Sequence, residues 1–145
     1  MSTNFLLLGV ILFMFNCAGV RPTNLGVKDG KLLICPQTPN CVSSQVDNTD
    51  SHFIEPYRYK KDLTTAFQEL KTVVENQKRT KIISFTENYI NAEFTSFLMG
   101  YVDDVEFYFD DTAKLVHVRS ASRLGKSDLG VNRKRIESIR EQLKW

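Results

Sequence analysis

The chain has few of the residues that mark specialised sites. Its 145 residues include three cysteines, two histidines and one tryptophan, and the cysteines and His52 lack the ligand spacing of a zinc site. Lys and Arg number 19 against 17 Asp and Glu, a formal net charge of +2. This balance offers no basic stripe, so we expect no nucleic-acid partner. A composition of 42% hydrophobic and 25% charged residues is typical of one globular domain.

The sequence also lacks a hydrophobic run long enough to cross a bilayer. The run from Phe5 to Phe15 lies in sixteen uncharged residues and is shorter than the ~20 residues of a spanning helix. Its length is typical of a signal peptide. With Cys17 next, the arrangement resembles a bacterial lipoprotein signal, although Asn16 and Met14 replace the usual small residue and Leu. We expect residues 1–16 to be a signal peptide and Cys17 to carry a lipid; a plain cleaved signal and an uncleaved short anchor are the alternatives.

Each of these alternatives places the rest of the chain outside the cytoplasm. We expect a membrane-anchored lipoprotein of the bacterial cell envelope, or alternatively a secreted or periplasmic protein. Residues 17–34 contain Pro and Gly breaks and little apolar pattern, which predicts a flexible tether. Residues 35–145 are the expected single domain. If Cys17 is lipidated, Cys35 and Cys41 remain as a pair in an oxidising compartment, which favours a disulfide between them.

Apolar periodicity predicts two helices and five strands. Asp62 offers an N-cap for a helix over 63–76, whose apolar residues recur every three or four positions. A second amphipathic helix is expected over 129–143, with one apolar face formed by Leu129, Ile136, Ile139 and Leu143. Segments rich in β-branched and aromatic residues predict strands at 80–85, 89–98, 104–109 and 114–122.

The order of these elements predicts an α+β fold. Residues 52–57 form the first strand, at an edge because Pro56 cannot donate to a central ladder. Short connections between the next four strands indicate an antiparallel meander. We therefore expect a curved sheet of four to five strands covered by two amphipathic helices, in the order strand-helix-four strands-helix. This outline is TBP-like or helix-grip-like, which by itself says nothing about function.

Four stretches of the domain form a longer pattern: "CPQTPNCVSS", "HFIEP", "AEFTSFLMGYVDDVEF" and "VRSASRLGKSDLGVNRKRIESIR". Together they resemble the domain of unknown function 1499 family over residues 35–142. The function of that family is unassigned, so the resemblance implies little about activity. The resemblance implies a secreted, lipidated or membrane-linked protein, in agreement with the amino terminus here. The matching positions are Pro39, Asn40, Cys41, Val42, Ser43, Ser44, His52, Ile54, Pro56, Asp103, Asp104, Val105, Glu106, Arg119, Ser120, Ser122, Arg123, Gly125, Asp128, Gly130, Asn132, Arg133 and Arg135.

The cysteine segment also permits a catalytic interpretation. Cys41 would be a nucleophile with His52 as its base, or would act in thiol redox chemistry with Cys35. The sequence shows no nucleophile elbow or helix start at Cys41. A disulfide between Cys35 and Cys41 is the leading interpretation, and we expect no metal and no other cofactor.

Carboxylates and arginines gather in the last two strands. Alternation places Asp104 and Glu106 on one face of their strand, and a hairpin through "DDTA" would bring one of them near Arg119 and Arg123. Pairing across the two strands is the simplest explanation. A ligand-binding arginine and carboxylate chemistry are the alternatives.

The segment between the last strand and the last helix carries further charge. Ser127 or Asp128 can cap that helix, and Arg133 in its first turn opposes the positive end of the helix dipole. Carboxylates or a bound anion can offset that opposition. A hydrogen-bonded corner is one interpretation. An anion site is the other, and its candidate residues are Arg119, Arg123, Arg133, Asp103 and Asp104.

Six large apolar side chains are expected to fill the core or to line an apolar pocket: Phe85, Phe94, Phe97, Leu98, Phe107 and Phe109. The leading hypothesis is a non-catalytic domain, held to the membrane through a lipid on Cys17, that binds a small anionic or amphipathic ligand or a partner protein. The alternatives are a cysteine-dependent enzyme using Cys41 with His52 and a purely structural envelope module.

Overall fold

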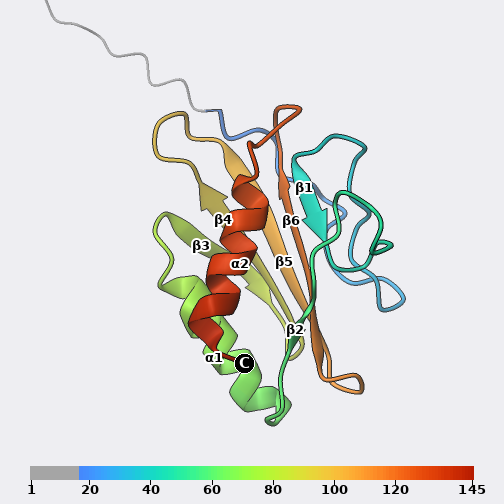
Figure 1. Cartoon of the computed structure of the whole chain (residues 1–145). Helices are drawn as coiled ribbons and strands as arrows, with labels where there is room; N and C mark the ends of the chain where they lie inside the picture. Colours follow the sequence, from blue (N-terminus) through green and yellow to red (C-terminus); the bar gives the residue numbers. More distant parts are fainter. Residues whose placement is uncertain (1–16) are drawn as a thin grey trace, which may run out of the picture.

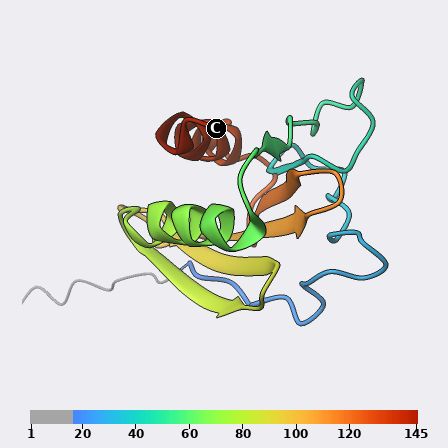
Figure 2. The same cartoon turned by 90° about the horizontal axis from the view of Figure 1, so that it is seen from below.

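Two helices cover one face of a six-stranded sheet, which confirms the predicted α+β class (Figures 1 and 2). The computed structural model describes residues 17–145, and the signal peptide predicted over residues 1–16 lies outside that range. The elements follow in the order β1 (Cys41–Ser43), β2 (Tyr57–Arg58), α1 (Leu63–Glu75), β3 (Thr80–Phe85), β4 (Tyr89–Thr95), β5 (Val102–Asp110), β6 (Leu115–Ser122) and α2 (Val131–Leu143).

Strands β3 to β6 form the predicted antiparallel meander, and the order in the sheet is β1-β6-β5-β4-β3. Both β1 and β2 pair with β6, at different positions along it. The strand expected over 52–57 is reduced to β2, and Phe53 forms only an isolated bridge with Ser43. Strand β1 was not predicted, because three residues are too few to show an alternating pattern.

The helices begin close to their predicted starts. The carboxylate of Asp62 accepts hydrogen bonds from the backbone nitrogen and the hydroxyl of Thr65 at 2.9 and 2.7 Å, as expected of an N-cap. The carboxylate of Asp128 accepts from the backbone nitrogens of Gly130 and Asn132 at the start of α2. Leu129 does not belong to the apolar face of α2: it precedes the helix with a φ of 54° and is 86% exposed.

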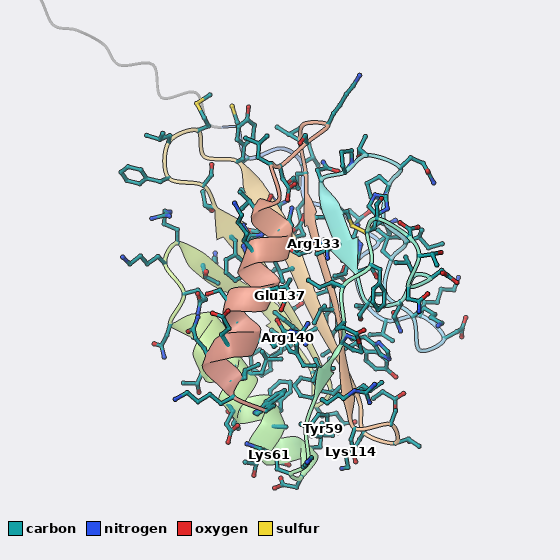
Figure 3. All side chains as sticks on the ribbon, in the orientation of Figure 1. Tyr59, Lys61, Lys114, Arg133, Glu137 and Arg140 are labelled. Carbon is teal, nitrogen blue, oxygen red and sulfur yellow. A yellow bond between two sulfur atoms is a disulfide. The ribbon has the colours of Figure 1, made fainter. Side chains whose placement is uncertain are left out.

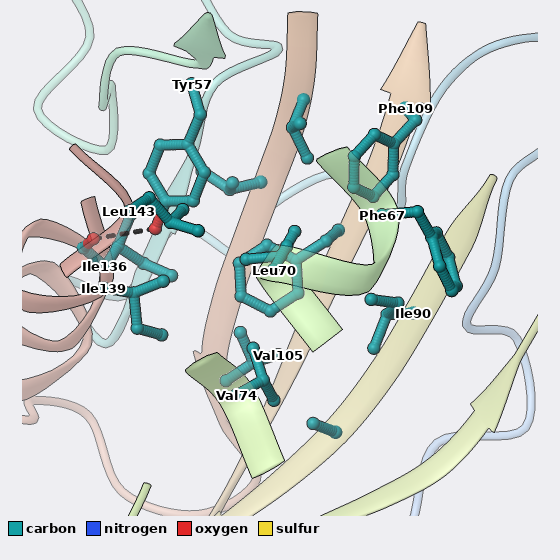
Figure 4. Packing of buried hydrophobic residues seen from close by; sticks show 14 of the residues in the cluster. Tyr57, Phe67, Leu70, Val74, Ile90, Val105, Phe109, Ile136, Ile139 and Leu143 are labelled. Atoms are coloured by element: carbon teal, nitrogen blue, oxygen red, sulfur yellow. Dashed lines mark hydrogen bonds between the residues drawn. The ribbon is translucent and has the colours of Figure 1, made fainter. Parts of the chain in front are cut away.

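The core lies between the helices and the inner face of the sheet, as Figure 4 shows. The hydroxyl of Tyr57 donates to the backbone oxygen of Ile136 at 2.7 Å and ties β2 to α2. Of the six large apolar residues expected inside, three are buried: Phe94, Phe107 and Phe109. The other three, Phe85, Phe97 and Leu98, are exposed, because two lie in the connection after β4 and one ends the edge strand β3.

The predicted tether crosses the outer face of the sheet, opposite the helices (Figure 2). Leu32 is buried there, and the backbone nitrogen of Gly26 donates to the carboxylate of Glu106 at 2.8 Å. Arg21 pairs with Glu93 of β4 at 2.6 Å. Residues 17–34 therefore pack on the outer face of the sheet at these contacts. Their flexibility stays a prediction.

Candidate functional site

A cluster of charged side chains lies on the outer face of the sheet. Glu106 of β5 and Arg119 of β6 are direct cross-strand partners, with 3.3 Å between Oε2 and Nη1. Glu106 is fully buried and also accepts from the hydroxyl of Tyr89 at 2.8 Å and from Gly26. The predicted pairing of strand carboxylates with Arg119 is confirmed.

Arg123 completes this outer charge cluster. Its Nε and Nη2 donate to the two carboxylate oxygens of Asp104 at 2.8 and 2.6 Å, a bidentate pair. It also donates to Glu93. Burial raises the pKa of Glu93, but hydrogen bonds from Arg21 and Arg123 outweigh it and lower that pKa below its usual value. Three carboxylates meet three arginines, so the cluster holds little spare positive charge for an anionic ligand.

One hydrogen-bond donor in the cluster has no acceptor. Nε of Arg119 is the one buried side-chain polar atom in residues 17–145 without a hydrogen-bond partner. Burial lowers the pKa of Arg119, and the nearby carboxylates of Glu106 and Asp104 act in the opposite direction. A buried arginine with this carboxylate partner is held as a structural ion pair.

A second polar network lies on the inner face, at the start of α2. Asp103 pairs with Arg135 at 2.5 Å. Asn132 is fully buried and donates to the backbone oxygen of Asn40 and to Ser122 Oγ, both at 3.1 Å. These bonds form the hydrogen-bonded corner that the sequence allowed.

The five candidate anion-binding residues are therefore divided among three places. Arg119, Arg123 and Asp104 belong to the outer charge cluster, and Asp103 belongs to the inner network. Arg133 lies on the side of α2 next to β1 (Figure 3) and donates to the backbone oxygens at positions 51 and 53, at 2.9 and 2.7 Å. The structure does not assemble them into one site.

The two catalytic candidates lie near Arg133. Cys41 and His52 both line a hollow of about 100 Å³, but Cys41 is in a disulfide with Cys35, with 5.7 Å between the Cα atoms. His52 Nδ1 contacts Asp50 at 2.7 Å and Nε2 contacts the backbone oxygen of Thr38 at 3.2 Å. Both ring nitrogens thus face acceptors of their own. Hydrogen bonds from His52 lower the pKa of Asp50.

A larger cleft lies between α2 and the end of β4, and we call it the α2–β4 cleft. It has a volume of about 590 Å³. The guanidinium of Arg79 lies over the ring of Phe97 at 5.4 Å, and that of Arg135 lies over Phe94 at 4.7 Å. Nη1 of Arg135 donates to Asn132 Oδ1 and Ser120 Oγ at 2.6 and 3.2 Å, and its Nη2 donates to Asp103. Arg79 is therefore the arginine that presents to the cleft a flat cation backed by an aromatic face.

The charge of the α2–β4 cleft is positive. The carboxylate of Asp103 forms an ion pair with Arg135. Lys78 and Arg79, in contrast, meet no carboxylate among the described residues. Nε of Arg79 donates only to the backbone oxygen of Thr95, at 3.1 Å. An adjoining hollow of about 190 Å³ extends the cleft toward apolar side chains, including Tyr101, Leu124 and Val131. The cleft therefore combines cationic and apolar walls.

Sequence reasoning missed Arg79 and Arg135 as residues of this cleft. Arg79 follows α1 in a turn with a φ of 55°, and Arg135 lies in α2, more than fifty residues away. Only packing brings them together, so no local motif identifies the pair.

Another hollow, of about 390 Å³, lies beside the carboxyl end of α2. Two arginines line it, and Arg58 is exposed. The other, Arg140 (Figure 3), already donates to the backbone oxygens of Glu55 and Pro56 and to the side chain of Glu137, and it lies over the ring of Tyr57. Few of its donors remain for a ligand.

Neither a metal centre nor a membrane span is found in the part of the chain that the structure describes. Residues 17–145 contain no group of three or more His, Cys, Asp or Glu side chains placed to hold a metal ion. None of the helices in that range is long and apolar enough to cross a membrane.

The comparisons with known proteins give one match. A family model described as "Protein of unknown function (DUF1499)" matches residues 31–143, which confirms the resemblance. The match includes the inner network, the α2–β4 cleft and the outer charge cluster except for Arg21 and Gly26. No curated protein and no solved structure matches the chain.

Proposed function

The chain belongs to the DUF1499 family of proteins of unknown function, and we propose that this member is a membrane-anchored, non-catalytic domain that binds a small amphipathic anion in the α2–β4 cleft. The stack of Arg79 on Phe97 beside Lys78 carries the proposal, because neither cation meets a carboxylate among the described residues. A guanidinium stacked on a ring keeps its in-plane N–H groups directed outward, where a carboxylate or phosphate can accept two of them.

The apolar part of the ligand would lie on the cleft's own rings. Phe97 is 76% exposed, and Val131 and Leu124 extend the apolar wall into the adjoining hollow. A ligand with an anionic head and a short apolar tail satisfies both walls, whereas an inorganic anion would satisfy only the basic one. Binding sites commonly join an apolar lining to a few polar groups in this way.

Full-length protein in phosphatidylcholine nanodiscs, titrated with hexyl phosphate, tests this proposal. We expect saturable binding that Arg79→Gln weakens about tenfold or more, since a charge-assisted hydrogen bond is lost. Lys114→Gln is the matched control, because Lys114 is also exposed with a φ of 55° and lies in the turn between β5 and β6. Inorganic phosphate and hexanol, titrated separately, should each bind more weakly than hexyl phosphate.

Equal binding by wild type and Arg79→Gln, or no binding of hexyl phosphate, would overturn the ligand proposal. The second result would leave a structural envelope module or a protein-binding module as the better description.

The proposal includes an extracytoplasmic location with a lipid on Cys17. Cys17 is the free cysteine and is partly exposed, and the disulfide at Cys35 is typical of oxidising compartments. Mass spectrometry of the amino-terminal peptide from membranes should find Cys17 with a thioether-linked lipid. An unmodified Cys17, or a peptide that retains residues 1–16, contradicts lipid attachment.

A cysteine-dependent enzyme is less well supported. The sulfur of Cys41 is bonded to Cys35, and both residues are buried, at 3% and 8% exposure, which limits access to a thiol partner. Denatured, unreduced protein should therefore show no reactive thiol at either position. Two reactive thiols there would favour the enzyme instead.

A further inference from the structure

Exposed apolar side chains gather at one end of the molecule. Of the eleven large hydrophobic residues exposed in the described chain, three lie elsewhere: Val27, Ile34 and Phe85. The other eight form what we call the apolar end: Val20, Phe97, Leu98, Met99, Tyr101, Leu124, Leu129 and Val131. They come from the start of the described chain, the β4–β5 connection, the β6–α2 connection and the first residue of α2, which Figure 1 shows at the same end.

The fold does not explain these side chains. Leu98 and Leu129 are each 86% exposed, so they contribute almost nothing to the core. Leu129 also has a φ of 54°, a conformation that branched side chains rarely adopt and that costs free energy. Exposed apolar side chains that cluster in this way mark an interaction surface.

The position of the amino terminus indicates what the surface meets. Gly19 lies against Leu124, since a Cβ placed on Gly19 would be 3.0 Å from Leu124 Cγ. The uncharged apolar run ends at Phe15, two residues before Cys17, which is at most ~7 Å of chain. A bilayer that receives that run, or a lipid on Cys17, would therefore lie next to the apolar end.

The distribution of charge agrees with an anionic lipid surface. Lys78, Arg79 and Lys126 are exposed near the apolar end, and the carboxylate of Asp128 there caps α2. Basic residues near the surface strengthen binding to anionic headgroups, and a tyrosine such as Tyr101 is favoured at the level of the headgroups.

The far end of the molecule is different. Its exposed residues include Lys60, Asp62, Glu87, Asp111 and Lys114, with both signs of charge mixed. A membrane contact at that end would place these charges against lipid. One end is thus apolar and basic and the other carries mixed charge, as expected of a domain with one side toward a bilayer.

We propose that the apolar end is a second, non-covalent membrane contact, inserted into the surface of the bilayer that holds the amino terminus. The inference rests on the membrane anchoring in the proposed function and is independent of ligand binding. It places the first turn of α2 at the membrane and the carboxyl terminus away from it. Because Phe97 and Val131 line both the apolar end and the α2–β4 cleft or its adjoining hollow, the cleft would open at the lipid surface.

Tryptophan quenching by brominated lipids tests the contact. Full-length protein is reconstituted in vesicles of phosphatidylcholine and phosphatidylglycerol with bromine on the upper acyl chain. An inserted residue reaches ~5–10 Å into the interface, so Leu98→Trp should lose about half or more of its added fluorescence. The native Trp145 follows α2 at the far end and is the internal control.

A second variant controls for the substitution itself. Phe85→Trp adds a tryptophan at a position that is 56% exposed at the far end of β3, and its fluorescence should be no more quenched than that of Trp145. Equal quenching of Leu98→Trp and Phe85→Trp would overturn the inference.

The remaining outcomes distinguish failure of this second membrane contact from failure of the amino-terminal anchor. If the protein floats with the vesicles but Leu98→Trp is not quenched, the apolar end meets something other than lipid, and dimers detected by cross-linking would identify a second copy. If the protein does not float, the anchor itself is absent and the inference is overturned with it. The hexyl phosphate titration reports on the cleft in either case.

Discussion

At the scale of single residues, the buried charges of this protein stabilise the sheet. Glu106 is fully buried and accepts hydrogen bonds from Tyr89, Gly26 and Arg119. Each of these donors would lose a charged acceptor if the carboxylate were removed. The cost of such a change comes mostly from the partner charge that stays buried without compensation.

We therefore expect Glu106→Gln to lower the free energy of unfolding by about 3 kcal/mol, measured by urea denaturation at neutral pH. Glu75→Gln is the control, because Glu75 pairs with Lys71 on the surface of α1 and is 49% exposed. Its loss should cost less than about 0.5 kcal/mol. Equal effects of the two changes would show that the Glu106–Arg119 pair contributes nothing beyond a surface pair.

The second residue-scale prediction concerns pH. Burial lowers the pKa of His117, Asp110 opposes this and Lys31 adds to it; His117 also stacks on Tyr108. The unfolded chain, with a histidine pKa of about 6.5, then binds the proton more readily than the folded protein. Stability should be full above that pH and should fall as the pH drops through the folded pKa.

Urea midpoints of wild type and His117→Gln between pH 5 and 8 test this expectation. The variant should lose part of the decline below about pH 6.5. His52 is present in both proteins, so its contribution cancels in the comparison. An unchanged slope in the variant would show that His117 is not the group responsible.

At the scale of elements, Asn132 connects α2 to β1 and β6. It lies in the first turn of α2 and donates to Asn40 just before β1 and to Ser122 at the end of β6. Asn132→Ala should lower the free energy of unfolding by about 2–3 kcal/mol, because buried partners lose their hydrogen bonds. Asn76→Ala, at the exposed carboxyl end of α1, should change it by less than about 0.5 kcal/mol. Similar values for both would mean that water replaces the bonds of Asn132.

Elements were predicted where their pattern is long. The bounds of β3 match the predicted 80–85, and α1 ends one residue before the prediction. Strand β1 was missed because its pairing with β6 lies outside its own three residues. The start of α2 was placed two residues early because Leu129 fits the apolar spacing, although its side chain points to solvent.

At the scale of the whole molecule, residues 17–34, which we call the outer segment, are attached to the rest of the domain by few backbone hydrogen bonds. Its backbone is held by the bond from Gly26 to Glu106, by two bonds with the side chain of Gln45 and by a short turn at 28–31. Gln45 accepts from the backbone nitrogen of Leu32 and donates to the backbone oxygen of Gly30, both at 2.8 Å. Strand β5, in contrast, is paired on both sides. Regions with few backbone bonds and little buried surface open locally, before the whole domain unfolds.

Hydrogen exchange should therefore separate the outer segment from the sheet. We expect amides in 19–31 to exchange about 100-fold or more faster than those of β5, with Gly26 slower than its neighbours. In Glu106→Gln that protection of Gly26 should decrease. Equal protection from exchange in the outer segment and in β5 would contradict local opening of the outer segment.

The sequence by itself determined the α+β class, the meander and the pairing of Asp104 and Glu106 with Arg123 and Arg119, because helical spacing and strand alternation are local properties. It favoured the Cys35–Cys41 disulfide by the count of cysteines in an oxidising compartment. Only the tertiary structure decided that Asp103, Arg119 and Arg133 belong to separate places, since neighbouring strand residues face opposite sides of the sheet. The α2–β4 cleft and the apolar end also required it. Their walls come from segments far apart in the chain, and only packing of the helices on the sheet brings those segments together.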